Sequence, residues 1–174
     1  DLRARALSPA IAEARIQALQ ARIRPHFLYN SINAVLSLSR SDPKRAERAL
    51  EDLADLFRVL MADNRALTPL SKEIDIARQY LAIEELRLGD RLRLEFDVED
   101  AALPALVPSL ILQPLVENSL KYAVAPREEG GRLRIIARLE HGQLKLVVAD
   151  DGPGLPVGVE LGEVVGRLLP VDAQ

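Results

Sequence analysis

The chain has 174 residues, of which 48% are apolar and 28% are charged, with a formal net charge of −3 and no cysteine. This length and apolar content suit one domain, or two small ones, with a hydrophobic core. The composition argues against a nucleic-acid-binding surface, because it contains no dense run of Lys and Arg, and it excludes disulfide scaffolds and thiolate metal sites. No apolar run approaches the roughly 20 residues that span a bilayer, and no signal peptide is visible.

The first part of the chain has the period of two long helices. Apolar residues recur at alternating steps of four and three from Leu7 to about Ser39, which predicts a heptad seam packed against another helix. Asp42 and Pro43 then predict the start of a second helix. Two such helices cannot close a core alone, so we expect a four-helix bundle from two chains, with a hairpin packed on its own chain as the alternative. The predicted seam is Leu7, Ile11, Ala14, Ala18, Ala21, Pro25, Leu28, Ile32 and Val35, and the stripe of the second helix is Ala46, Leu50, Leu53, Phe57 and Leu60.

The remainder of the chain mixes helices with strands. Thr68 and Pro69 break the helical pattern, and residues alternate between apolar and charged from Leu92 to Val98, which is typical of a strand. Helices and strands that are segregated in this way predict an α+β sandwich, with one sheet covered by helices on one face. The expected elements are a helix from Ser71, as N-cap, to Leu88 before Gly89, a strand over 92–98, a helix over 109–123, strands over 133–139 and 144–148 around the turn 140–143, and a closing strand over 164–170.

A histidine at position 26 lies inside the first predicted helix. Pro25 before it removes a backbone donor and distorts the helix, which can expose a neighbouring side chain. His26 lies beside the seam, and the positions three and four residues later, Tyr29 and Asn30, could not share a metal with it. An imidazole is partly unprotonated at neutral pH and can act as a nucleophile. The residues alone leave a structural, a metal-binding and a nucleophilic role open.

A second motif runs from Gln113 to Lys121. Asn118 and Lys121 are three residues apart on one face of a predicted helix. An amide oxygen suits Mg²⁺, and a lysine can neutralise a phosphate. The alternative is the solvated polar face of an amphipathic helix, to which Gln113 and Glu117 would also belong.

A third motif, Asp150-Asp151-Gly152-Pro153-Gly154, ends a predicted strand. Glycines let the backbone approach a flat ligand, and a carboxylate can accept from an exocyclic amine such as N6 of adenine. A turn from strand to loop can require the same residues for purely conformational reasons.

In this order, the three motifs resemble the cytoplasmic core of LytS/AlgZ-type sensor histidine kinases. The resemblance runs through residues 19–33, 70–74, 80–84 and 87–91, and it then covers both later motifs. It implies dimerisation and histidine phospho-acceptor helices over residues 1–66, a connecting helix over 67–90 and an ATP-binding domain of the GHKL type over 91–174.

The same resemblance implies a function. His26 would be phosphorylated from ATP in a homodimer, and the phosphoryl group would pass to a response regulator of the LytTR DNA-binding kind, so that the kinase itself contacts no nucleic acid. Because a membrane-spanning sensor region precedes this core in full-length relatives, and the chain begins at Asp1 within a helical pattern, we expect the cytoplasmic part of a longer bacterial inner-membrane protein. The implied nucleotide roles are Asn118 as the Mg²⁺ ligand, Lys121 at the phosphates, Asp150 at adenine, and Gly152 and Gly154 in shaping the pocket.

Some positions depart from the kinase pattern. Phe27 follows His26 where many other histidine kinases have a carboxylate base, and Tyr122 stands where a histidine is common. The segment between Gly154 and the expected closing strand is too short for the usual glycine-rich lid, so we expect the lid to be missing. A non-catalytic dimeric signalling module is therefore the alternative function. A gyrase-like or Hsp90-like ATPase is disfavoured, because Pro114 occupies the place of the glutamate that activates water.

Overall fold

The computed structural model describes residues 25–62, 66–153 and 164–167. The chain divides into two compact units, Asp1–Asp63 and Asn64–Gln174. The predicted helical segment from Leu7 to residue 24 lies outside the described residues.

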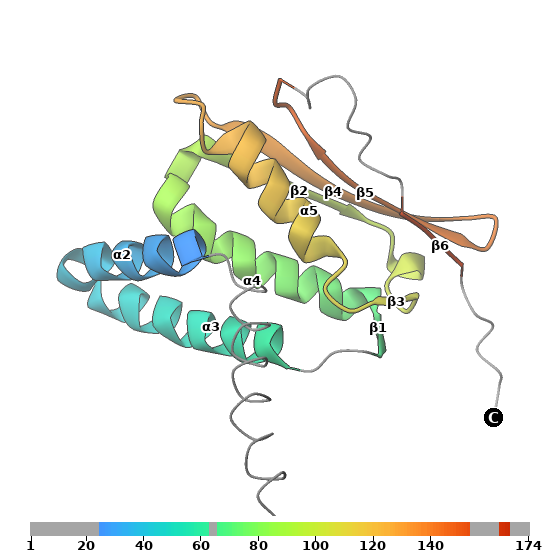
Figure 1. Cartoon of the computed structure of the whole chain (residues 1–174), viewed down its shortest axis with the longest axis horizontal. Coiled ribbons are helices and arrows are strands. Elements are labelled where there is room, and N and C mark those ends of the chain that lie inside the picture. The colour runs from blue at the N-terminus through green and yellow to red at the C-terminus, as the bar shows by residue number, and fades with distance from the viewer. Residues whose placement is uncertain (1–24, 63–65, 154–163, 168–174) are drawn as a thin grey trace, which may run out of the picture. The chain divides into compact units, whose positions relative to one another are not determined.

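The described residues of the first unit form a helical hairpin of α2 (Pro25–Ser41) and α3 (Pro43–Met61) (Figure 1). Asp42 separates the two helices, and its main-chain N donates to the carbonyl oxygen of Leu38 at 2.7 Å. The side chain of Asp42 accepts from the main-chain N of Arg45 at 3.1 Å, which satisfies one free donor at the start of α3. The predicted start of the second helix is confirmed.

The hairpin buries a stripe that differs in part from the predicted seam. Phe27, Ser31 and Val35 of α2 are buried, and the rings of Phe27 and Phe57 meet edge to face with their centres 6.3 Å apart. Ile32, which was expected on the seam, is 41% exposed. On α3 the buried residues are Ala46, Ala49, Leu53, Leu56 and Leu60, so three of the five predicted positions are confirmed, whereas Leu50 is 55% exposed and Phe57 is half-buried.

The second unit contains a mixed four-stranded sheet. Its strands are β2 (Leu92–Val98), β4 (Gly131–Glu140), β5 (Gln143–Asp150) and β6 (Val164–Arg167), in the order β2-β4-β5-β6. β2 is parallel to β4, and the other two pairs are antiparallel. The turn between β4 and β5 places His141 at φ 50° and Gly142 at φ 74°, as a tight two-residue hairpin turn requires. The predicted strands and the hairpin are confirmed, and the closing strand predicted over 164–170 is confirmed over residues 164–167, where the described part ends.

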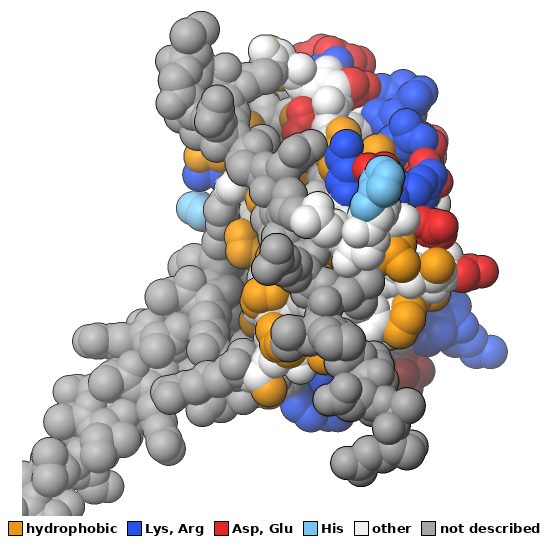
Figure 2. Space-filling model, turned by 90° about the vertical axis from the view of Figure 1, so that its right-hand side faces the viewer, with side chains coloured by type: hydrophobic (Ala, Val, Ile, Leu, Met, Phe, Trp, Pro, Cys, Tyr) orange, Lys and Arg blue, Asp and Glu red, His pale blue; other side chains and the backbone are white. Residues whose placement is uncertain are grey.

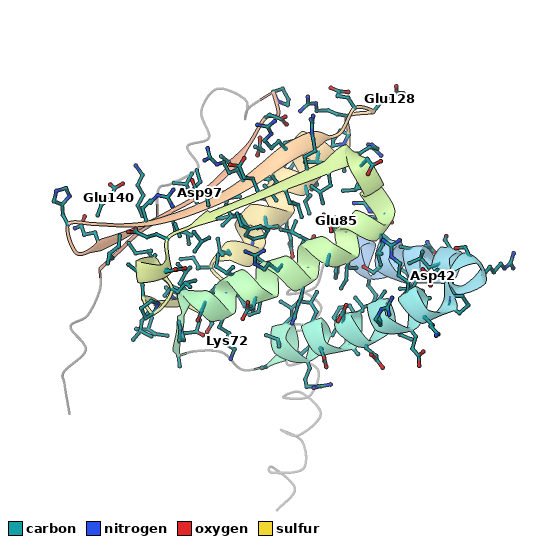
Figure 3. All side chains as sticks on the ribbon, turned by 180° about the vertical axis from the view of Figure 1, so that it is seen from behind. Asp42, Lys72, Glu85, Asp97, Glu128 and Glu140 are labelled. Carbon is teal, nitrogen blue, oxygen red and sulfur yellow. The ribbon has the colours of Figure 1, made fainter. Side chains whose placement is uncertain are left out.

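Two helices, α4 (Leu70–Leu88) and α5 (Leu112–Ser119), cover one face of this sheet (Figures 1 and 3). The strands turn alternate apolar residues towards that face, and Leu133, Ile135 and Ala137 of β4 are buried in succession. The α+β arrangement expected from the sequence is therefore confirmed. None of the described helices combines the length and the apolar character that a membrane span requires.

The opposite face of the sheet carries charged residues. Arg134 of β4 lies 3.0 Å from Glu95 and 2.9 Å from Asp97, both on β2, and Arg138 also pairs with Asp97. Figure 2 shows basic and acidic side chains interspersed in the upper right of the view. In each pair the opposite charges of neighbouring strands neutralise one another, and cross-strand pairs of this kind stabilise a sheet.

The ends of α4 test two further predictions. Gly89 ends the helix at φ 56°, as predicted. The expectation that Ser71 is the N-cap is wrong, because the helix begins at Leu70 after Pro69. The main-chain N atoms of Leu70 and Ser71 donate to the carbonyl oxygens of Ala105 and Leu103, at 2.8 and 3.0 Å. Main-chain carbonyls from a distant segment thus replace the side-chain cap.

A small second sheet was not predicted. It pairs β1 (Leu67–Pro69) with β3 (Leu106–Pro108) in antiparallel register. Two three-residue strands, each ending in proline, carry too short a pattern to be recognised from sequence. Short 3₁₀ turns over Gly89–Arg91 and Asp100–Ala102 complete the connections around β2.

Candidate functional site

His26 is the second residue of α2, and its side chain is exposed. The next residue, Phe27, is buried against α3, so the helix is anchored while the imidazole faces outwards. No group of three or more His, Asp or Glu side chains that could hold a metal occurs among the described residues. The metal-binding alternative for His26 therefore has no support in this part of the chain, and an exposed imidazole is available in the first unit.

In the second unit, the beginning of α5 is held by a buried carboxylate of α4. Glu73 is 2% exposed, and its two oxygens accept from the main-chain N atoms of Leu110 at 2.8 Å and Leu112 at 3.4 Å. A negative charge at this end of a helix satisfies free N–H groups and interacts favourably with the helix dipole. α4 thereby fixes the position from which Asn118 and Lys121 project.

The predicted start of this helix at Ser109 is wrong by three residues. Leu110 adopts a left-handed backbone conformation, φ 60°, which cannot belong to a right-handed helix. The hydroxyl of Ser109 donates instead to the carbonyl oxygen of Ala66 at 2.9 Å. Pro114 falls in the first turn of α5, where a proline is tolerated, and it is exposed.

α5 continues directly into η3 (Leu120–Val124), a π-helical turn. The main-chain N of Ala125 donates to the carbonyl oxygen of Leu120 at 2.8 Å, five residues back. Single π turns inside helices occur frequently at functional sites. Asn118 is half-buried at the end of α5, and Lys121 is exposed with its ammonium 4.9 Å from the centre of the Tyr122 ring.

The end of β5 meets η3 at a glycine. A Cβ atom on Gly152 would lie 2.5 Å from the Cβ and 2.8 Å from the Cα of Ala123, so only glycine allows this approach. Asp150 is exposed, and its Oδ1 accepts from the main-chain N of Gly152 at 3.1 Å. The structure thus brings the two later motifs together in one unit. Gly154 lies outside the described residues.

Sequence reasoning missed Asp151 as an organising residue. Its Oδ1 accepts from the main-chain N of Arg132 at 2.9 Å and from Nη1 of Arg127 at 3.0 Å, and Arg93 lies 3.6 Å from its other oxygen. The bond from the Arg132 main chain, followed by that from Arg127, lowers the pKa of this carboxyl. No local pattern distinguishes Asp151 from Asp150, since its partners are distant in sequence.

The segment between η3 and β4 is fixed by Arg91. Its Nη2 donates to the carbonyl oxygens of Ala125 at 3.0 Å and Arg127 at 2.6 Å. Gly130, at φ 70°, packs so closely that a Cβ atom would lie 1.9 Å from the carbonyl oxygen of Arg91. The residues that follow the π turn therefore have a defined path, which positions Arg127 beside Asp151.

Comparisons with known proteins identify the family. The model of the family described as histidine kinase matches residues 14–92. The sensor protein LytS of Enterococcus faecalis is 35% identical over 150 residues, covering 86% of this chain and 26% of that protein. The sensor histidine kinase YesM of Bacillus subtilis is 35% identical over 146 residues, covering 83% of this chain and 25% of that protein. The chain thus spans about a quarter of the length of these curated relatives.

Among solved structures, the histidine kinase domain of a blue-light activated histidine kinase from Erythrobacter litoralis is similar, with a TM-score of 0.42 and 20% identity. The match covers 83% of this chain and 71% of that one. Residues 14–92 therefore belong to the histidine kinase family, and most of the chain is similar in sequence to sensor histidine kinases of the LytS/YesM type.

Proposed function

We propose that this chain is the kinase core of a two-component sensor, which phosphorylates its own His26 from Mg-ATP and passes the phosphoryl group to an aspartate of a response regulator. The observation that carries the proposal is the contact between Gly152 and Ala123, which joins both nucleotide motifs in one unit. The exposed His26 supplies the acceptor. Membership of the sensor kinase family supports the assignment.

The chemistry requires little from the protein beyond positioning and charge neutralisation. An unprotonated ring nitrogen of His26 attacks the γ-phosphorus of ATP, a nitrogen–phosphorus bond forms, and the bond to the β,γ-bridging oxygen breaks. ADP leaves with the electron pair of that bond. In the second step a regulator carboxylate takes the phosphoryl group, and the imidazole is regenerated.

The donor set suits a nucleotide with magnesium. Asn118 offers one amide oxygen, and the described residues provide no carboxylate cluster that would enclose a metal. Mg²⁺ fits such a site, because it commonly keeps several waters and takes phosphate oxygens as further ligands. When bound, it would neutralise charge on the β- and γ-phosphates. Lys121 is exposed one turn later and can contribute a positive charge.

Asp150 is the proposed adenine contact. Its carboxylate is exposed at the end of β5 and is oriented by the main-chain N of Gly152. A carboxylate can only accept hydrogen bonds at neutral pH, so it selects a base that offers an N–H group, such as the exocyclic amine of adenine. Because it has no side chain, Gly152 lets the backbone pass close to η3, and Gly154 is proposed to have the same role two residues later.

A homodimer is proposed from the surface of the helical hairpin. Tyr29, Ile32 and Leu36 of α2 are 68%, 41% and 59% exposed, and they follow the spacing of one helix face. Leu50 and Met61 of α3 are also large, apolar and about half exposed. A four-helix bundle formed with a second copy would bury such residues. In the complete protein we propose a membrane-spanning sensor region before this cytoplasmic core, and a LytTR-type regulator as partner.

The test is incorporation of label from γ-labelled ATP in the presence of Mg²⁺. The chain has two histidines, so His141→Gln, in the exposed β4–β5 turn, is a matched control for His26→Gln. We expect acid-labile, base-stable label on the unaltered chain and on His141→Gln, and none on His26→Gln.

Two other results would redirect the assignment. Label that persists in His26→Gln would show that the acceptor has been misassigned. A folded chain that binds ATP but takes up no label would favour the non-catalytic signalling module, the alternative suggested by Tyr122.

A further inference from the structure

An arginine and a carboxylate join the two halves of the candidate nucleotide site. Nη1 of Arg127 donates to both the main-chain oxygen and Oδ1 of Asp151, each at 3.0 Å. The same nitrogen lies 3.5 Å from the carbonyl oxygen of Ala123 in η3. Arg127 therefore links the helical segment that carries Asn118 and Lys121 to the strand end that carries Asp150.

Asp151 is held at its main chain as well as its side chain. Its main-chain N donates to the carbonyl oxygen of Arg132 at 3.3 Å, while its Oδ1 accepts from the N of the same residue at 2.9 Å. With the bonds from Arg127, its N, carbonyl O and carboxylate are all engaged. Few rotations of the backbone between Asp150 and Gly152 remain possible without breaking one of these bonds.

This restraint acts directly on Asp150. The Oδ1 atom of Asp150 accepts from the main-chain N of Gly152, across the peptide that Asp151 contributes. The direction of that N–H group depends on the Asp151 backbone, so the orientation of the Asp150 carboxylate does too. Gly152 in turn is pressed against Ala123, whose carbonyl oxygen faces Arg127.

We propose that Arg127 and Asp151 form a positioning pair, which orients the Asp150 carboxylate towards the exocyclic amine of the bound base and so makes the site selective for adenine over hypoxanthine. This inference rests on the proposed nucleotide-binding function and deepens it. Neither residue of the pair needs to touch the nucleotide. The selectivity for adenine therefore depends on Asp151, which is adjacent to Asp150, the residue that contacts the base.

Binding of ATP and of inosine triphosphate, in which a carbonyl oxygen replaces the amine, tests the proposal. We expect the unaltered chain to prefer ATP by about tenfold, the equivalent of ~1.4 kcal/mol. Asp150→Ala should abolish the preference by removing the contact. Asp151→Ala and Arg127→Gln should reduce it severalfold by removing the restraint, and Asp151→Ala should add nothing in the Asp150→Ala background.

Two variants separate positioning from general stability. Asp151→Asn keeps an oxygen that accepts from the N–H groups of Arg132 and Arg127, so it should retain most of the preference for ATP. This variant also keeps the test possible if Asp151→Ala does not fold. Asp97→Ala is the matched control, because Asp97 is likewise a partly exposed carboxylate paired with two arginines of the sheet. Figure 3 places Asp97 nearer Glu140 than Glu128, hence away from the Arg127 segment. This control should keep the full preference for ATP.

The outcomes distinguish the two proposals. If the unaltered chain binds neither nucleotide, the proposed function fails and this inference fails with it. If it binds ATP with a preference that Asp150→Ala removes but folded Asp151→Ala and Arg127→Gln retain, the positioning pair is refuted while the proposed function stands. Equal binding of both nucleotides by the unaltered chain would also refute the selectivity.

Discussion

The carboxylate of Glu73 in α4 accepts a hydrogen bond from the main-chain N of Leu110 at 2.8 Å, although the two residues are 37 positions apart. Its second oxygen accepts from Leu112 at the start of α5. Glu73 is almost fully buried, so the bond is shielded from water. One acidic side chain thereby connects the helix that precedes the sheet to the helix that carries Asn118.

Replacing Glu73 should destabilise the second unit. Glu73→Ala leaves the part-buried N–H group of Leu110 and the buried N–H group of Leu112 without their acceptor, which costs about 2–3 kcal/mol in the free energy of unfolding. Glu73→Gln retains one carbonyl oxygen and should cost less. Urea unfolding measures the difference, with Glu85→Ala, an exposed glutamate of the same helix, as control. Equal stability of Glu73→Ala and Glu85→Ala would show that the carboxylate does not hold α5.

Gly152→Ala tests the approach of β5 to η3. The new methyl group would lie 2.5 Å from the Cβ of Ala123, so the strand end and the π turn must move apart. Forcing extra volume into such a contact costs about 1–3 kcal/mol, and here it should also weaken nucleotide binding at least about tenfold.

Gly142→Ala is a suitable comparison for Gly152→Ala. Gly142 has φ 74°, and a Cβ atom at this position would have no neighbouring atom within 4 Å, so the alanine is strained but meets no neighbour. We expect a stability loss of about 1 kcal/mol with unchanged ATP affinity, because the turn is remote from both nucleotide motifs. Titration with a fluorescent nucleotide distinguishes the two variants. Unchanged affinity in Gly152→Ala would place the nucleotide elsewhere.

Features with a local cause were predicted correctly from the sequence. Alternation of apolar and charged residues identified β2, and capping chemistry identified the ends of helices at Asp42 and Gly89. The turn at His141 and Gly142 was also predicted, because hairpins need residues that accept positive φ there.

Features with a distant cause were not predicted. The start of α5 was placed too early, because the left-handed conformation of Leu110 accompanies a hydrogen bond that its main-chain N donates to Glu73 in another helix. Asp151 was not separated from Asp150, since its partners Arg127 and Arg132 are 24 and 19 residues away in the sequence. The candidate residues could therefore be named from sequence, whereas the contacts that orient them could not.

Acid should remove a part of the stability that comes from Asp151. The main-chain N–H of Arg132 and the guanidinium of Arg127 lower the pKa of this carboxyl in the folded chain. A carboxyl with a lowered folded pKa stabilises the folded state above the pKa of the unfolded chain, about 3.9, and loses that contribution as pH falls through the folded value.

The comparison of the unaltered chain with Asp151→Asn across pH measures this contribution. The difference in free energy of unfolding should be constant from pH 7 to about 5 and should shrink below about pH 4. Asp97, whose pKa is lowered chiefly by a hydrogen bond from Arg138, should behave in the same way in Asp97→Asn. A difference that persists unchanged at pH 3 would mean that the charge of Asp151 contributes nothing.

The apolar stripe on α2 gives a prediction about assembly. Ile32 is 41% exposed between Tyr29 and Leu36, which are more exposed still. Ile32→Glu therefore disturbs little within its own hairpin, but a glutamate in the core of a bundle would be buried without a partner, which is strongly unfavourable. Asn33→Glu adds the same charge at the next, exposed position of α2 and serves as the control. By sedimentation analysis the unaltered chain and Asn33→Glu should be dimers, and Ile32→Glu should be a folded monomer. A dimer that survives Ile32→Glu would move the interface away from this stripe.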